Sequence, residues 1–311
     1  MIPLARLLTL ALLSIISEAA QNPATVPYRT PETPMGTGAY KAIMEMEASL
    51  PTHTIYRPAK LKAVPGKLPI VAWGNGGCIN TGNRFRHFLT EISSHGYLVI
   101  AIGPIGPKEM EEAPQPPKAG AAAPGSPYGP PATKASQLID AVNWAIAENA
   151  RKGSQYFKRL DIRKIALMGQ SCGGVQAISA SADPRVTTTV AWNSGLLPVP
   201  NPGMENVRKE ALEKLHAPIA YFNGDSSDVA HKNGKDDFER LTKVPALFAY
   251  RKGMGHNGTY RESNGGELGK VAVAYLDWRL KASKTGARMF QGADCTLCTD
   301  TKWKIFKKQI D

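Results

Sequence analysis

The alternation of short apolar runs with longer amphipathic segments is the feature that most constrains the fold of this 311-residue chain. Regular structure begins around residues 53–57, and strands are predicted at residues 68–73, 97–103, 162–168, 186–192, 218–222 and 246–250. Helices are predicted at residues 136–150, 172–182, 205–215, 230–241 and 268–281. Nearly continuous apolar strands are typically covered on both faces, and strands that alternate with helices form mostly parallel sheets. The sequence therefore predicts an α/β fold with a mostly parallel central sheet and helices on both faces.

Residues 1–19 have the order of a secretory signal peptide. Arg6 supplies a positive charge, residues 7–16 form an apolar run, and Ser17 and Ala19 are small residues at positions −3 and −1 of a cut after Ala19. An uncut anchor is the alternative, but the run is short for a span of about 20 residues. We therefore expect a secreted protein, extracellular or periplasmic, with no integral membrane span after signal cleavage.

The rest of the chain divides by composition into one domain with flanking segments. Residues 20–50 are rich in Pro, Thr and Gly and are predicted to be an extended lead-in to a single domain at 51–284. Within it, residues 104–134 are rich in Pro, Ala and Gly and too long for an ordinary connection. We interpret them as a surface loop; a flap that covers a functional site is the alternative. Residues 285–311 form a basic, Cys-containing appendage whose end is expected to dock onto the domain.

The formal net charge of +12 favours adsorption to anionic surfaces, and a generally basic solvated surface is the alternative. The basic residues are dispersed and no nucleic-acid motif is present, so nucleic acid is not an expected partner.

The strongest local motif is Gly-x-Ser-x-Gly at residues 169–173, with Ser171 at its centre. An apolar strand precedes it, and small residues open a helix after it. A sharp turn at this point projects the serine hydroxyl from the edge of the sheet, and the glycines give the turn the room that it needs. The context therefore predicts that Ser171 is a nucleophile rather than part of a plain glycine-rich turn.

This strand–turn–helix arrangement resembles the nucleophile elbow of the α/β-hydrolase superfamily, over roughly residues 50–284. The general features look like secreted serine esterases of the dienelactone-hydrolase, chlorophyllase and polyester-hydrolase-like branches, although dienelactone hydrolases have Cys as the nucleophile. The family order of Ser, acid and His implies that His256 is the base, with His231 as runner-up and His216 in a structural or solvated role. It also implies Asp228 as the acid, with Asp225 as the alternative.

The resemblance further implies an oxyanion hole made by the backbone N–H of Cys172 and a second N–H from the loop 74–78. Gly77 is favoured as this second donor and Gly76 is the alternative; Asn75 stands where the family often has His. Because both loops must converge on one oxygen, we expect Cys78 to lie close to Cys172. A disulfide between them is the hypothesis, and two buried free thiols are the alternative.

Cys295 and Cys298 would then pair with each other, since a zinc site needs more ligands than this motif offers. Trp192 ends the strand after the nucleophile helix, where polyester hydrolases carry a Trp that stacks on the acyl part of the substrate. A core Trp is the equal alternative.

These features together predict a secreted serine hydrolase that cleaves a small-molecule or polymeric ester through an acyl-enzyme, with no cofactor and no metal. A serine peptidase on the same fold and a non-catalytic binding protein that retains the fold are the alternatives.

Overall fold

The computed structural model describes residues 36–107, 131–201 and 203–310. The predicted signal peptide, residues 20–35 of the lead-in and residues 108–130 of the predicted loop lie outside the described residues. The predictions for those segments therefore stay predictions.

A nine-stranded sheet forms the centre of the molecule, in the order β1-β2-β4-β3-β5-β6-β7-β8-β9. The strands are β1 (Ala42–Met46), β2 (His53–Pro58), β3 (Leu68–Gly74), β4 (Leu98–Ile102), β5 (Leu160–Gln170), β6 (Thr188–Trp192), β7 (Ile219–Gly224), β8 (Ala246–Arg251) and β9 (Trp303–Lys308). From β4 to β8 all neighbouring strands are parallel, whereas β1, β2 and β9 pair antiparallel at the two edges. The predicted α/β fold with a mostly parallel sheet is confirmed.

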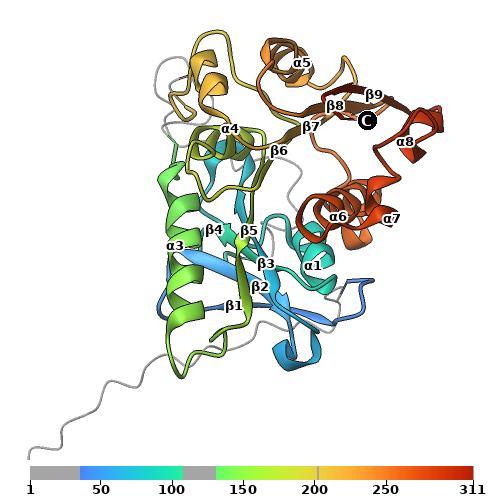
Figure 1. Cartoon of the computed structure of the whole chain (residues 1–311). Helices are drawn as coiled ribbons and strands as arrows, with labels where there is room; N and C mark the ends of the chain where they lie inside the picture. The colour runs from blue at the N-terminus through green and yellow to red at the C-terminus, as the bar shows by residue number, and fades with distance from the viewer. Residues whose placement is uncertain (1–35, 108–130, 202, 311) are drawn as a thin grey trace, which may run out of the picture.

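Helices cover both faces of this sheet because successive strand residues point to opposite sides. On one face, Val71 and Trp73 of β3 pack with α1 (Arg86–Ser94) and α6 (Gly266–Lys281). On the other face, Ile70 and Ala72 pack with α3 (Ser136–Ala150), α4 (Cys172–Ala180) packs on β5 and β6, and α5 (His231–Arg240) packs on β7 and β8. Figure 1 shows the sheet between α3 on one side and α1 and α6 on the other.

The structure corrects three details of the sequence prediction. Residues 42–46 are a paired strand rather than extended lead-in, and α1 was not predicted. Only Lys209–Lys214 of the predicted helix 205–215 is helical, as the 3-10 helix η3. The sequence around it is charged and flanked by prolines, and the segment is anchored in the core by Val207, Leu212 and Leu215, with Met204 and Ala211 packed against them.

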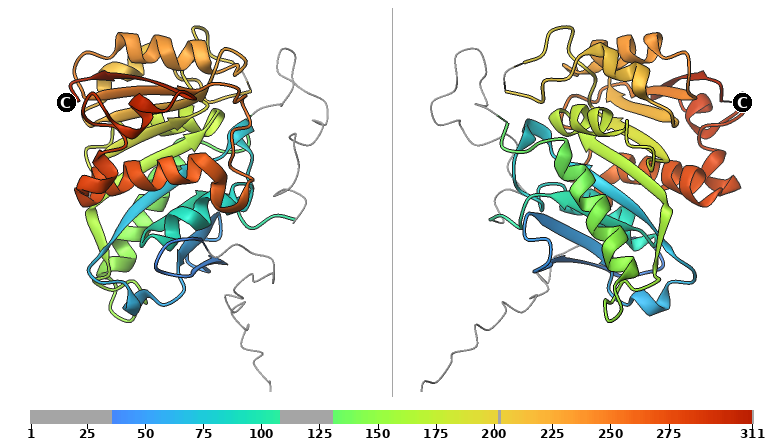
Figure 2. Two further views of the ribbon diagram at one scale, coloured as in Figure 1. Left: turned by 90° about the vertical axis from the view of Figure 1, so that its right-hand side faces the viewer. Right: turned by 60° about the vertical axis from the view of Figure 1, so that its left-hand side comes forward.

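The C-terminal segment completes the sheet as its edge strand β9, which pairs with β8 (Figure 2). A disulfide joins Cys295 to Cys298 in the short turn of helix α8 (Thr296–Thr299) that precedes this strand. The Lys308 ammonium donates hydrogen bonds to the carbonyl oxygens of Phe238, Glu239 and Leu241 at the C-terminal end of α5, at 2.7, 2.8 and 2.9 Å. Its positive charge there complements the negative end of the helix dipole.

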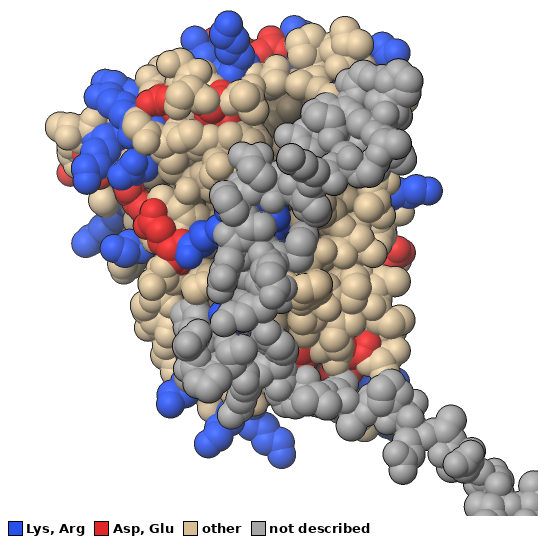
Figure 3. Space-filling view, turned by 180° about the vertical axis from the view of Figure 1, so that it is seen from behind, with Lys and Arg blue, Asp and Glu red and all other residues tan. Residues whose placement is uncertain are grey.

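Figure 3 shows Lys and Arg side chains mainly around the rim of one face, with a denser group at the upper left edge. Within the ranges that the structure describes, no helix is both long and apolar enough to cross a membrane.

Candidate active site

Ser171 occupies the sharp turn between the end of β5 and the start of α4. Its backbone has φ 53° and ψ −119°, a conformation that residues with a side chain rarely adopt. The Ser171 N–H donates to the carbonyl of Trp192 at 2.9 Å, and the Ser194 hydroxyl donates to the carbonyl of Ser171 at 2.7 Å. These bonds to the neighbouring segment hold the strained turn in place.

The glycine at 173 is required by the close approach of two segments. A Cβ atom on Gly173 would lie only 2.0 Å from the carbonyl oxygen of Gly74, at the end of β3. The first turn of α4 can therefore pack against the end of β3 only because no side chain stands between them. This contact brings the loop after β3 beside Ser171.

The candidate site lies at the carboxyl ends of the parallel strands, because each of its residues follows one of these ends. Ser171 follows β5, Asp228 follows β7, His256 follows β8, and Gly77 follows β3. The carboxyl ends of neighbouring parallel strands lie at the same edge, where sites of open α/β sheets are usually found.

Ser171, His256 and Asp228 form one continuous chain of hydrogen bonds. The Ser171 hydroxyl lies 3.0 Å from His256 Nε2, and His256 Nδ1 lies 2.7 Å from Asp228 Oδ1. The His256 side chain is 29% exposed, whereas the Asp228 side chain is completely buried. The imidazole therefore faces solvent beside the hydroxyl, with the carboxylate behind it.

The Asp228 carboxylate accepts four hydrogen bonds. His256 and the backbone N–H of Ala230 donate to Oδ1, and the Asn193 amide and the backbone N–H of Gly224 donate to Oδ2. Burial acts to raise the pKa of Asp228, but the hydrogen bonds from His256, Ala230 and Asn193 outweigh it, so that this pKa lies below its ordinary value. The carboxylate is therefore ionised at neutral pH.

The competing candidates lie elsewhere. Asp225 is partly buried and accepts hydrogen bonds from Ser227 and from the Gly253 N–H, so it tightens the loop. His231 Nδ1 faces the carbonyl of Gly224 at 2.9 Å, and His216 Nε2 faces the carbonyl of Val186 at 3.2 Å. Neither histidine makes a hydrogen bond with a carboxylate of this site.

The two backbone groups expected to bind an oxyanion lie on segments that a disulfide joins. Cys172 is the first residue of α4, so its N–H has no acceptor within the helix. Gly77 is half-buried and has φ 66°, within a single 3-10 turn, η2 (Gly76–Cys78). The disulfide between Cys78 and Cys172, with 5.3 Å between their Cα atoms, fixes these segments to each other. Both cysteine pairings expected from the sequence are therefore present.

Trp192 does not line the site, and the expectation that it stacks on substrate is not supported. Its side chain is fully buried, stacked on Phe222 with ring centroids 4.7 Å apart and packed edge-on against Phe88 at 5.2 Å. The core alternative describes this residue, because the aromatic side chains of α1 and β7 enclose the indole.

Four polar residues that support the site were missed in the sequence. Gln170 Nε2 donates to the carbonyl of His256 at 3.1 Å, Ser194 holds the turn at Ser171, and Asn193 and Tyr260 bond each other. Asn193 and Gln170 could have been found as polar residues at the carboxyl ends of buried strands.

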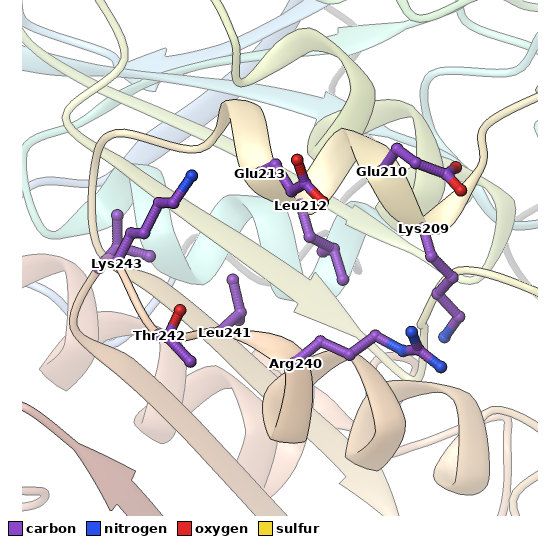
Figure 4. A pocket seen from close by; sticks show the side chains of 9 residues that line it. Lys209, Glu210, Leu212, Glu213, Arg240, Leu241, Thr242 and Lys243 are labelled. Atoms are coloured by element: carbon purple, nitrogen blue, oxygen red, sulfur yellow. The ribbon is translucent and has the colours of Figure 1, made fainter.

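A cavity of about 150 Å³ lies between η3 and the end of α5 (Figure 4). Its lining includes none of the candidate active-site residues. Lys209, which lines it, is already paired with Asp236 and Asp237 at 2.7 and 2.5 Å. In the described part of the chain, no group of three or more His, Cys, Asp or Glu side chains could hold a metal ion.

Comparison with known proteins does not assign this chain to a family. The sequence matches no protein-family model, and no curated protein matches it. The geometry around Ser171 is therefore the main indication of what the protein does.

Proposed function

We propose that this protein is a secreted serine hydrolase of the α/β-hydrolase fold, which cleaves carboxylic esters through an acyl-enzyme. The observation that carries the proposal is the hydrogen-bond chain from Ser171 through His256 to the buried Asp228, at a strained strand-to-helix turn. A serine hydroxyl is a weak nucleophile, and a neighbouring imidazole activates it by taking its proton. The two hydrogen bonds are within the range that such proton transfer requires.

In the first half of the reaction, Ser171 Oγ attacks the ester carbonyl carbon while His256 Nε2 accepts the hydroxyl proton. The Asp228 carboxylate accepts the hydrogen bond from His256 Nδ1, which fixes the tautomer that leaves Nε2 free and stabilises the imidazolium. Collapse of the tetrahedral intermediate breaks the ester C–O bond. The imidazolium gives its proton to the leaving alcohol, and the acyl group stays on Ser171.

In the second half, a water molecule repeats the attack on the acyl-enzyme. His256 takes a proton from the water and returns it to Ser171 Oγ as the carboxylic acid leaves. The N–H groups of Cys172 and Gly77 are the proposed donors to the oxyanion in both halves, because both belong to the segments that meet beside Ser171.

The proposal that the protein is secreted is supported by features outside the candidate active site. The two disulfides suit an oxidising compartment, and the first residues of the sequence have the order of a signal peptide. The proposed substrate is a carboxylic ester, small-molecule or polymeric. A peptidase on the same fold and a catalytically inactive binding protein are the alternatives, which the following experiment separates.

The test is hydrolysis of a panel of p-nitrophenyl esters, cutin, polyester and feruloyl esters, and peptide p-nitroanilides. Turnover of at least one ester, with little turnover of anilides, supports the proposal. The Ser171→Ala variant should retain its fold by circular dichroism and lose this activity. Turnover of anilides alone would indicate the peptidase, and no turnover by folded protein would indicate the binding protein.

A further inference from the structure

The side chain of Asn193 connects Asp228 to the loop that carries His256, through one residue on each side of that histidine. Its Nδ2 donates to Asp228 Oδ2 at 2.8 Å and to the carbonyl of Gly255 at 3.3 Å. Its Oδ1 accepts a hydrogen bond from the hydroxyl of Tyr260. Gly255 immediately precedes His256, and Tyr260 follows it by four residues. The Asn193 amide therefore contacts Asp228 and a residue on each side of His256.

The loop that Asn193 holds has little regular structure of its own. Residues 252–262 form turns between β8 and the single 3-10 turn η4 (Ser263–Gly265), with glycines at 253, 255 and 258. Such a segment needs side-chain hydrogen bonds to fix its position, since glycines leave the backbone free to move. Asn193 supplies these from the rigid end of β6.

The chemistry of Asn193 fits this role closely. The residue is fully buried and has φ 40°, a left-handed conformation that Asn tolerates better than most residues with a side chain. Burial raises the pKa of Tyr260, as does the charge of Asp228, so its hydroxyl stays protonated and donates. This donation fixes the amide with its oxygen toward Tyr260 and its NH₂ toward Asp228.

We propose that Asn193 is a positioning residue, which sets the orientation of Asp228 and the place of His256 relative to Ser171. The inference rests on the proposed function for its kinetic consequence. Its structural consequence is independent of it: without the amide, the hydrogen bond between His256 and Asp228 loses its fixed geometry. Reacting groups displaced by about 1 Å cost roughly 100-fold in rate.

The test uses Asn193→Gly in the full-length protein. Glycine accepts the positive φ without strain, so this variant removes the amide while leaving the backbone conformation available. Thr188→Val is the matched control: it lies at the opposite end of β6, is buried, and loses hydrogen bonds to the Pro218 carbonyl and the Tyr275 hydroxyl. Both variants should be folded and less stable than the wild type.

Two readouts are measured for each variant. The first is kcat and KM on the best ester; the second is the proton resonance of His256 Nδ1–H, assigned by its absence in His256→Ala. For Asn193→Gly we expect kcat to fall about 100-fold with KM within about twofold, and the resonance to broaden or disappear. Thr188→Val should keep the wild-type kcat and KM and the wild-type His256 resonance. Tyr260→Phe, which frees the amide to turn, should give a smaller loss of kcat.

The outcomes separate the two proposals. A folded Asn193→Gly protein with wild-type kcat and an unchanged resonance overturns the positioning role. If the wild type hydrolyses no ester, the proposed function fails, and the His256 resonance alone then tests the positioning role of Asn193. Its loss in Asn193→Gly but not in Thr188→Val then supports the positioning role, and its persistence in both overturns it.

Discussion

Removal of the disulfide between Cys78 and Cys172 should reduce both stability and activity, by separate physical causes. The perturbation is the double variant Cys78→Ala, Cys172→Ala, in which both replaced side chains are buried; it also removes the sulfur that accepts a hydrogen bond from Gln176 Nε2. The bond joins residues 94 apart in the sequence. The chain-entropy relation for a loop of that length gives about 4–5 kcal/mol of stabilisation at 25 °C.

That loss should be visible in calorimetry. For a chain of this size, 1 kcal/mol corresponds to roughly 2–4 °C in Tm, so the expected decrease is about 10–20 °C. Activity should fall as well, because Cys172 carries one proposed oxyanion donor and Cys78 adjoins the other, Gly77, and the loss of one such donor costs about 100-fold in kcat. A loosened donor should cost less than that, so we expect kcat to fall by about tenfold to 100-fold.

The second disulfide provides the matched control. Cys295 and Cys298 are three residues apart, so the same relation gives a much smaller stabilisation, about 2 kcal/mol, and neither residue touches the candidate site. The Cys295→Ala, Cys298→Ala variant should therefore lose less Tm and keep its kcat. Equal losses of Tm in the two variants, or thiols that react at positions 78 and 172 in the native wild type, would refute the reasoning.

Three further predictions concern single residues. Asp228→Asn should lower kcat by about 10⁴-fold at unchanged fold. Since the native pKa of Asp228 is lowered, its contribution to stability is present above about pH 4 and lost as pH falls through the native value, so Tm of this variant should fall less steeply than that of the wild type between pH 4 and pH 2. Trp192→Phe should cost about 1–3 kcal/mol in urea unfolding and leave KM unchanged, because the indole is enclosed in the core; a raised KM would restore a substrate role. Lys308→Met should cost about 1 kcal/mol by removing the ammonium from the end of α5, with kcat unaffected, and an unchanged midpoint would show that the contact is not stabilising.

The central strands and the principal site candidates could be predicted from the sequence because their signals are local. The strands of the parallel core are nearly continuous apolar runs, and the small residues around Ser171 mark a sharp strand-to-helix turn. The loops at residues 224–230 and 253–258 follow such strands directly, and the resemblance to the family order of Ser, acid and His nominated Asp228 and His256 within them.

The remaining features depend on contacts between distant segments. The strand at 42–46 is recognisable only through its pairing with β2, and the strand at 303–308 only through its pairing with β8. The burial of Trp192 also depends on distant segments, since Phe88 and Phe222, which pack against its ring, come from other elements. The role of Asn193 depends on a backbone conformation and on three partners from two loops, none of which a local pattern shows.

The most direct test of the nucleophile is covalent labelling with a fluorophosphonate, followed by peptide mass spectrometry of the folded protein. We predict one adduct, on Ser171, that is lost in Ser171→Ala and forms much more slowly in His256→Ala. An unlabelled folded protein, or an adduct on another residue that persists in Ser171→Ala, would contradict it.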